Sequence, residues 1–279
     1  MLAVVLALAA SLSYGAGDFL GGSQTRRTSL WTVLVFSQPT GLLLMVLVVL
    51  ARGEPLPQDV LLPALASGLL MVVTLAAYYK ALAVGVMSII GPVFSLSVAV
   101  PVVVGLTRGE RPSAVQLAGI AIALGGVVLA SREKSAGEHH TATSRASVGL
   151  ALLSGVAYGF VMVFYARGAE ADPYWSIAIS RLTSMVVFAL AFVVARPVLK
   201  PTRRAILPLL AIGVFEVGAF TLLSVASTLA YLSIVSVLAS VYPVFLALLA
   251  YVFLRERLAR AQLVGVAAAL AGVALIAAG

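Results

Sequence analysis

The chain has 279 residues, of which 62% are hydrophobic and only 10% are charged, with a mean hydropathy of +1.13. Soluble domains carry about 25% charged residues, so the composition excludes a water-soluble globular protein and indicates an integral membrane protein. Cysteine is absent, which excludes disulfides, thiolate chemistry and cysteine metal ligands. The net charge of +8 comes from Lys and Arg dispersed in short loops, so we expect contacts with membrane lipids and no nucleic-acid partner.

Apolar runs long enough to cross a bilayer core of about 30 Å recur along the whole chain. They lack strict alternation, which favours helices over a barrel. The first run follows Met1 with no basic segment, so we expect a retained helix instead of a cleaved signal peptide. Ten helices are predicted at residues 2–22, 30–51, 60–80, 86–106, 113–131, 148–167, 174–195, 205–225, 233–253 and 260–278.

The two halves of the chain repeat one another. Residues 108–130 and 254–276 match at 11 of 23 positions without a gap. Each copy has a Glu-Arg turn, a Gln-Leu pair and two glycines seven residues apart, namely Glu110, Arg111, Gln116, Gly119 and Gly126, then Glu256, Arg257, Gln262, Gly265 and Gly272. We therefore predict a five-helix repeat at residues 1–131, a polar linker at 132–147 and a second repeat at 148–279. Since five is odd, the second repeat enters the membrane in the opposite sense, as in many secondary transporters.

This repeated turn, followed by Gln-Leu-x-Gly and an apolar helix, resembles the EamA branch of the drug/metabolite transporter superfamily. The resemblance covers nearly the whole chain. It implies an all-α membrane protein with ten transmembrane helices and pseudo-twofold symmetry around a central cavity. The implied activity is export or exchange of small metabolites by alternating access. Amino acids, nucleosides and drugs all remain candidate substrates.

Four charged side chains fall within the predicted helices, where each costs about 2.5–3.5 kcal/mol on insertion scales. Arg181 and Glu216 lie at similar depths on neighbouring antiparallel helices, so an ion pair is within reach. It is either a buried structural pair or a cavity-lining pair that binds a polar substrate or takes up a proton for coupling. Asp18 and Lys80 lie near helix ends on one membrane side, where we expect an interfacial pair or snorkelling.

Aromatic and amide side chains at membrane depth supply further candidates. Tyr14 and Tyr158 occupy equivalent positions in the two halves, so they suit either a cavity wall or core packing. Gln38 precedes a proline and suits a gate or a substrate hydrogen bond. The predicted substrate-binding residues are Glu216, Arg181, Tyr14, Gln38, Tyr158, Tyr78 and Tyr242.

Other repeated features favour structural roles. Glu110 and Glu256 are expected to order turns by binding loop amides or a neighbouring Arg. The glycines spaced by seven allow close helix packing, either within a monomer or across a homodimer seam. Trp31 and Trp175 begin helices and are expected to anchor them at the membrane surface.

An intramembrane enzyme is the least favoured class. His139 and His140 both lie in the polar linker, and no group with metal-ligand spacing occurs, so we expect no catalytic residue and no metal site. No nucleotide-binding loop occurs, so a secondary carrier of a small-molecule substrate, without a cofactor, is expected. The alternative is a membrane channel or scaffold without an alternating-access cycle.

We expect a multi-pass protein of the cell (plasma or inner) membrane, with two competing orientations. Loops after the odd-numbered helices hold 13 Lys and Arg, against four on the other side. The positive-inside rule then places both termini outside. The family resemblance implies cytoplasmic termini.

Overall fold

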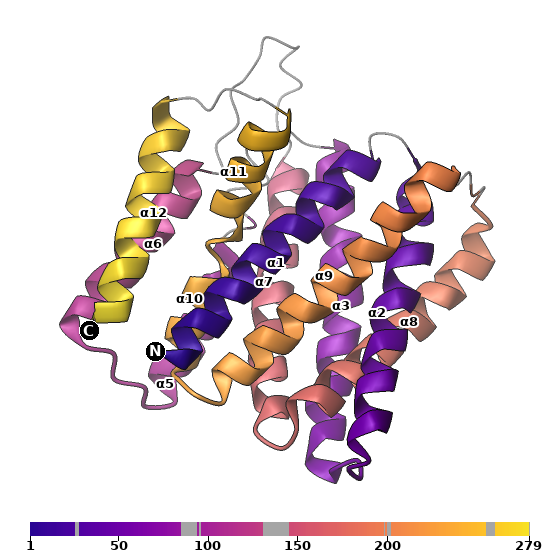
Figure 1. Ribbon diagram of the computed structural model, residues 1–279, viewed down its shortest axis with the longest axis horizontal. Coiled ribbons are helices and arrows are strands. Elements are labelled where there is room, and N and C mark those ends of the chain that lie inside the picture. Colours follow the sequence, from indigo (N-terminus) through magenta and orange to yellow (C-terminus); the bar gives the residue numbers. More distant parts are fainter. Residues whose placement is uncertain are drawn as a thin grey trace.

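The computed structural model describes residues 1–25, 28–84, 94, 96–130, 145–197, 199, 202–254 and 260–278, and within these it contains helices and no strands (Figure 1). Six helices are long and apolar enough to cross a membrane. They are α1 (Leu2–Thr25), α2 (Leu30–Arg52), α3 (Gln58–Val84), α7 (Arg145–Ala169), α8 (Pro173–Ala195) and α9 (Arg203–Ser227). The protein is therefore a multi-pass membrane protein.

The remaining helices are shorter. They are the 3₁₀ segment η1 (Leu96–Val98), α5 (Ala99–Thr107), α6 (Ala114–Ala130), α10 (Leu232–Ala239), α11 (Tyr242–Leu254) and α12 (Arg260–Ala278). Apolar stretches of α6 and α12, Ala114–Leu129 and Leu263–Ile276, fall below the length of a full span. The predicted linker is largely outside the described residues, as are Glu256 and both linker histidines.

The predicted helix at 233–253 is in fact two helices. α10 ends at Ala239 and α11 begins at Tyr242, with Ser240 and Val241 forming a turn between them. Pro243 lies in the first turn of α11, where a missing N–H leaves no helical hydrogen bond unmade. The predicted helix at 86–106 is described only toward its end, where η1 leads into α5.

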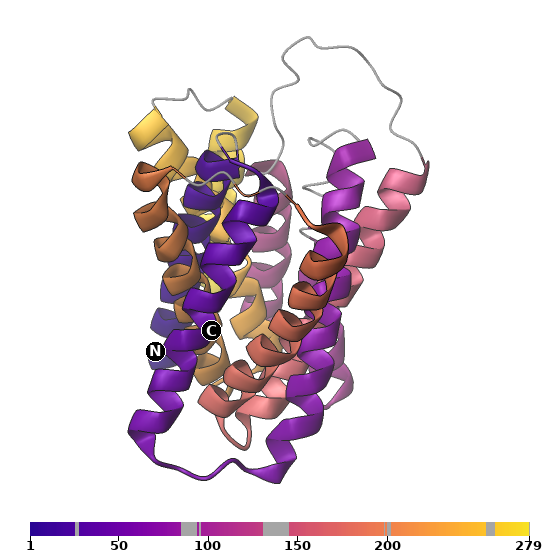
Figure 2. The same ribbon diagram turned by 90° about the vertical axis from the view of Figure 1, so that its right-hand side faces the viewer.

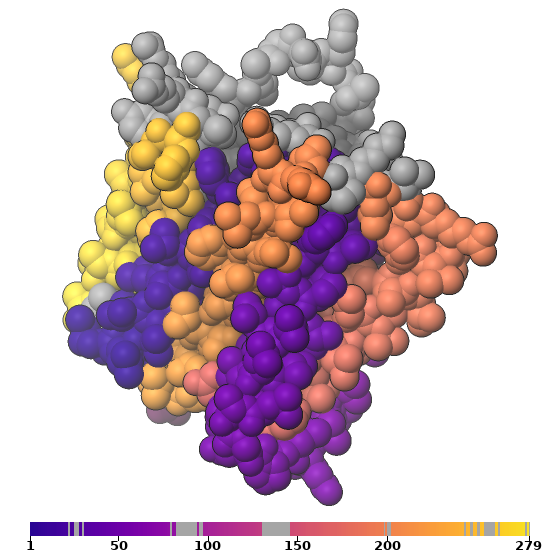
Figure 3. Space-filling model, turned by 45° about the vertical axis from the view of Figure 1, so that its right-hand side comes forward, coloured from indigo at the N-terminus to yellow at the C-terminus, as the bar shows by residue number. Residues whose placement is uncertain are grey.

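Helices of the first half pack mainly on helices of the second half. α1 packs on α9, α3 on α7 and α8, and α2 on α8 and α9. Figure 2 shows α3 beside α7 and α8 on one side of the bundle, and Figure 3 shows α9 at the surface between α1 and α2. The two halves are therefore intertwined.

The glycine stripes of α6 and α12 face each other within this one chain. A Cβ atom added at Gly119 would lie 2.8 Å from the Gly272 carbonyl oxygen. One added at Gly126 would overlap the backbone nitrogen of Ala269. Such small residues let two helix backbones touch. The seam is intramolecular, which decides between the two packing alternatives for these glycines.

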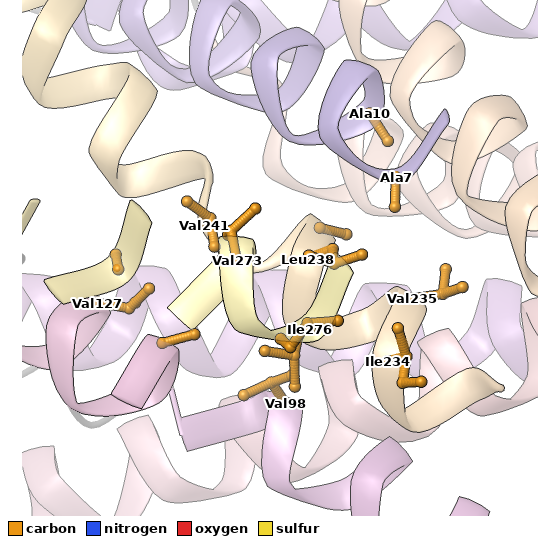
Figure 4. Close-up of a cluster of buried hydrophobic side chains, with 14 of the residues drawn as sticks. Ala7, Ala10, Val98, Val127, Ile234, Val235, Leu238, Val241, Val273 and Ile276 are labelled. Carbon is orange, nitrogen blue, oxygen red and sulfur yellow. The ribbon is translucent and has the colours of Figure 1, made fainter. Parts of the chain in front are cut away.

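The largest apolar core lies where α1, η1, α6, α10 and α12 converge (Figure 4). Every residue of α10 is buried in it or beside it. Large aliphatic side chains instead cover the outside, with Leu62 at 77%, Val194 at 84% and Leu207 at 76% exposure. An apolar exterior of this kind is suited to lipid contact.

Candidate functional site

A polar cluster joins three helices at the centre of the bundle. Arg181 of α8 donates from Nη1 to the Gln38 Oε1 atom of α2 at 2.9 Å and to the Glu216 Oε2 atom of α9 at 3.2 Å. Gln38 in turn donates from Nε2 to Glu216 Oε2 at 3.0 Å. The side chain of Arg181 is 5% exposed and that of Glu216 is 30% exposed. The cluster is thus a closed triangle of charge-assisted hydrogen bonds.

Glycines make room for the guanidinium group. A Cβ atom at Gly41 of α2 would lie 3.3 Å from Arg181 Nη1 and 3.3 Å from the Gly213 carbonyl oxygen of α9. One at Gly213 would overlap the Ser37 carbonyl oxygen. The absence of both side chains lets α2 and α9 approach closely beside the Arg181 head group. Arg181 also lies over the Phe220 ring, with its Cζ atom 5.4 Å from the ring centroid.

The cluster forms part of the wall of a cavity of about 190 Å³. All seven residues predicted to bind substrate line it. The full lining consists of Tyr14, Asp18, Leu34, Gln38, Met71, Thr74, Leu75, Tyr78, Phe94, Tyr158, Tyr165, Arg181, Ser184, Glu216, Phe220 and Tyr242. Both halves of the chain contribute, since α1, α2 and α3 face α7, α8, α9 and α11 across the space.

Aromatic rings form two groups in the cavity wall. Tyr78 and Tyr158 each contact Phe94, with ring centroids 4.7 Å and 5.3 Å apart. Tyr14 lies 6.1 Å from Tyr242 and edge-on to Phe220 at 5.2 Å. Offset and edge-to-face pairs in this range are attractive beyond their buried area. The cavity is therefore lined by both aromatic rings and the polar cluster.

The comparisons with known proteins agree with this architecture. The sequence pattern of the EamA-like transporter family matches residues 1–132 and 145–278. The chain belongs to this family. The predicted resemblance is thereby confirmed, and EamA-like transporters are membrane transporters of the drug/metabolite transporter type.

A crystal structure of another protein superposes on this EamA-like transporter with a TM-score of 0.82 at 20% sequence identity. The match covers 98% of this chain and 95% of that chain. At this identity it shows the shared fold alone. A search of curated sequences finds no match.

Several cavity residues of this EamA-like transporter were not among the predicted site residues. Asp18, expected near the membrane surface, lines the cavity because α1 continues to Thr25, three residues beyond its predicted end. Its position four residues after Tyr14 places both on one helix face. The same spacing relates Glu216 to Phe220. A search for residues three or four positions from each candidate would have found both Asp18 and Phe220.

Other polar contacts of this transporter stabilise the fold. The Glu110 carboxylate accepts hydrogen bonds from the backbone nitrogens of Leu232 at 2.8 Å and Ser233 at 3.1 Å, which begin α10. The prediction that Glu110 binds turn amides is confirmed, although the turn belongs to the opposite half. Asp172, which was not among the predicted residues, caps α8 by accepting hydrogen bonds from the backbone nitrogens of Tyr174 and Trp175.

At the end of α2, Arg52 pairs with the capping carboxylate Asp172 at 2.9 Å. Trp175 donates from its indole nitrogen to the Glu54 carbonyl oxygen at 3.1 Å. These contacts tie the end of α2 to the start of α8. Lys80 is exposed and is absent from the cavity wall. Within the described residues, no three His, Asp or Glu side chains gather into a metal-binding group.

Proposed function

We propose that this protein is a secondary-active transporter that exports or exchanges small metabolites across the cell (plasma or inner) membrane by alternating access. Its ten transmembrane helices form two inverted repeats, residues 1–131 and 148–279, joined by a linker at 132–147. The observation that carries this proposal is the cavity between the halves, in which Gln38 of the first half binds Arg181 and Glu216 of the second. Substrate sites of inverted-repeat carriers lie at such an interface.

The packing of the helices supports the inverted repeat. In the proposed repeats α1 corresponds to α7, α2 to α8 and α3 to α9. The contact of α1 with α9 then corresponds to that of α7 with α3, and the contact of α2 with α9 to that of α8 with α3. A twofold axis between the halves requires each such contact to occur twice, with the first and second repeats exchanged.

Two glycine contacts repeat this symmetry in detail. Gly68 of α3 packs on α8, where an added Cβ would lie 2.6 Å from the Ser180 carbonyl oxygen. Gly213 of α9 packs in the same manner on α2, at the Ser37 carbonyl oxygen. If Ser37 corresponds to Ser180, then Gln38 corresponds to Arg181. The two polar residues that hold Glu216 would then occupy equivalent positions in the two repeats.

The break between α10 and α11 supports movement at the cavity. Tyr242, which lines the cavity, is the first residue of α11 after this break. Discontinuous membrane helices are typical of the substrate sites of secondary transporters. A break in the backbone hydrogen bonds lets the two segments of such a helix reorient separately.

Proton coupling through Glu216 is part of the proposal. Protonation of the Glu216 carboxylate would remove the negative charge to which both Arg181 and Gln38 donate hydrogen bonds. The ion pair between α8 and α9 would open, and the contact with α2 would weaken. Glu216→Gln is expected to make solute flux independent of an imposed pH gradient. Flux that still follows the gradient in this variant would remove Glu216 from the coupling mechanism.

The transport function is tested with purified protein in proteoliposomes. A thermal-shift screen of amino acids, nucleosides and amines first selects ligands, and each ligand is then used in counterflow. A carrier predicts saturable uptake of labelled ligand against an excess of unlabelled ligand inside. Non-saturating flux would favour a channel, and binding without flux would favour a scaffold.

A further inference from the structure

Asp18 is the acidic side chain of the cavity that the polar cluster leaves unused. It lies on α1, and the preceding residue packs on α9, where a Cβ atom at Gly17 would lie 3.5 Å from Phe215 Cβ and 3.9 Å from Glu216 Cγ. This contact places Asp18 close to the level of Glu216. Asp18 is accessible to solvent and makes no hydrogen bond or ion pair with any described residue.

The charges of the described cavity wall do not balance. Glu216 is neutralised by Arg181, while no Lys or Arg among the described residues forms an ion pair with Asp18. An unpaired charge at membrane depth is costly, so a positively charged ligand group would be favoured beside Asp18. Arg181 offers little to an anion, because its Nε and Nη2 atoms are buried, without a partner among the described residues and out of contact with the cavity space.

The aromatic wall favours the same kind of ligand. The rings of Tyr14, Tyr78, Phe94, Tyr158 and Tyr242 surround the space that Asp18 also lines. Aromatic faces attract organic cations, and a carboxylate adds a charge-assisted hydrogen bond to an ammonium group. Together they provide an apolar enclosure for a hydrocarbon body and an anionic contact for its amine.

The volume of the cavity limits the size of the hydrocarbon part of the ligand. The cavity measures about 190 Å³, whereas an apolar protein cavity of roughly 150 Å³ holds one benzene molecule. Drug-sized ligands occupy pockets of about 300–1,000 Å³. A ligand with one ring and a short side chain therefore fits this volume.

We propose that the cavity binds a small organic cation, an amine carrying a single aromatic ring, with the Asp18 carboxylate as its counter-ion. The assignment rests on the proposed transport function and specifies its substrate class. Glu216 and Arg181, paired with each other, then line the site without binding the amine. Asp18 supplies the charge that recognises the ligand.

Binding to the purified full-length protein tests this assignment separately from transport. Phenethylamine, phenethyl alcohol and hydrocinnamate share one ring and a short chain but carry a positive, a zero and a negative charge. Isothermal titration should show that wild-type protein binds phenethylamine at least about tenfold more tightly than the other two. Equal binding of amine and alcohol, or a preference for hydrocinnamate, would overturn the assignment.

Variants identify the residue responsible. Asp18→Asn should weaken phenethylamine binding about tenfold or more and leave phenethyl alcohol binding unchanged. Asp59→Asn, an exposed carboxylate in the first turn of α3, is the matched control and should bind like wild type. Undiminished amine binding by Asp18→Asn would overturn the role of Asp18. If Asp18→Asn does not fold, the comparison of the three ligands on wild type still decides the charge preference.

The binding and counterflow experiments together distinguish failure of the cation site from failure of the proposed transport function. Charge-selective binding that depends on Asp18, without counterflow of phenethylamine, would support the site and contradict the carrier. Counterflow of other solutes without selective amine binding would support the carrier and contradict the cation site.

Discussion

At the residue scale, the Gln38–Arg181–Glu216 cluster combines two buried polar groups with one partly exposed carboxylate. Breaking a buried ion pair by removing one partner costs about 3–5 kcal/mol, whereas replacing both partners is often nearly neutral. Since Glu216 is 30% exposed, we expect the lower end of that range. The effects of substitutions within the cluster on the free energy of unfolding should therefore be strongly coupled.

Glu216→Gln should lower the thermal unfolding temperature in detergent, because Arg181 remains charged and 95% buried behind it. The loss is about 3 kcal/mol. The double variant Arg181→Met/Glu216→Gln should recover much of this loss, since no unpaired charge is left. A double variant as unstable as the sum of the two single variants would contradict an ion pair that matters to the fold.

Glu110 allows a second test at this scale. Glu110→Gln should destabilise the protein by about 1–2 kcal/mol, because the carboxylate accepts from two backbone nitrogens at the start of α10. Glu170→Gln, which alters only an exposed pair with Arg167, should change the unfolding temperature little. Equal effects of the two substitutions would argue against the capping role.

The sequence identifies the cavity residues that are unusual for a membrane helix. Arg181 and Glu216 are conspicuous because a charge at that depth needs a partner, and the structure brings them together. Asp18 was misplaced because hydropathy ends the first helix before Ser23, although polar residues continue α1 to Thr25. Phe94 and Phe220 could not be singled out, because phenylalanine is common on lipid-facing and packed surfaces alike.

At the element scale, the α6–α12 seam depends on which glycine faces the partner helix. Gly126 contacts the Ala269 backbone, whereas a Cβ at the adjacent Gly125 would meet nothing within 4 Å. Gly126→Ala should cost about 1–3 kcal/mol by separating the helices. Gly125→Ala should be neutral or stabilising by up to about 1 kcal/mol through helix propensity. Thermal unfolding of both variants measures the difference, and a reversed order would contradict the seam.

Hydropathy predicts most of the long helices but not the break between α10 and α11. The apolar pattern continues through Ser240 and Val241, so nothing in its periodicity marks an end. The turn is stabilised by local contacts instead. Ser240 donates from Oγ to the Val237 carbonyl oxygen at 2.7 Å, and Pro243 lies in the first turn of the next helix. Such side-chain contacts depend on geometry that an apolar run does not reveal.

At the scale of the whole molecule, the duplication predicts two similar halves but not how they interlock. The packing of α1 on α9 and of α3 on α7 joins segments that are at least 61 residues apart in the sequence. Only the assembled structure shows that the cavity lies between these pairs. Alternating access, as proposed for this protein, means that this cavity opens in turn to the two sides of the membrane.

The absence of cysteine allows that claim to be tested directly in a single-cysteine variant. Met71→Cys places a thiol on the cavity wall, while Val244→Cys places one in the buried core. In membrane vesicles, an impermeant thiol reagent applied to either side should label Met71→Cys, and neither application should label Val244→Cys. Labelling of Met71→Cys from one side alone, with ligand present or absent, would contradict alternating access.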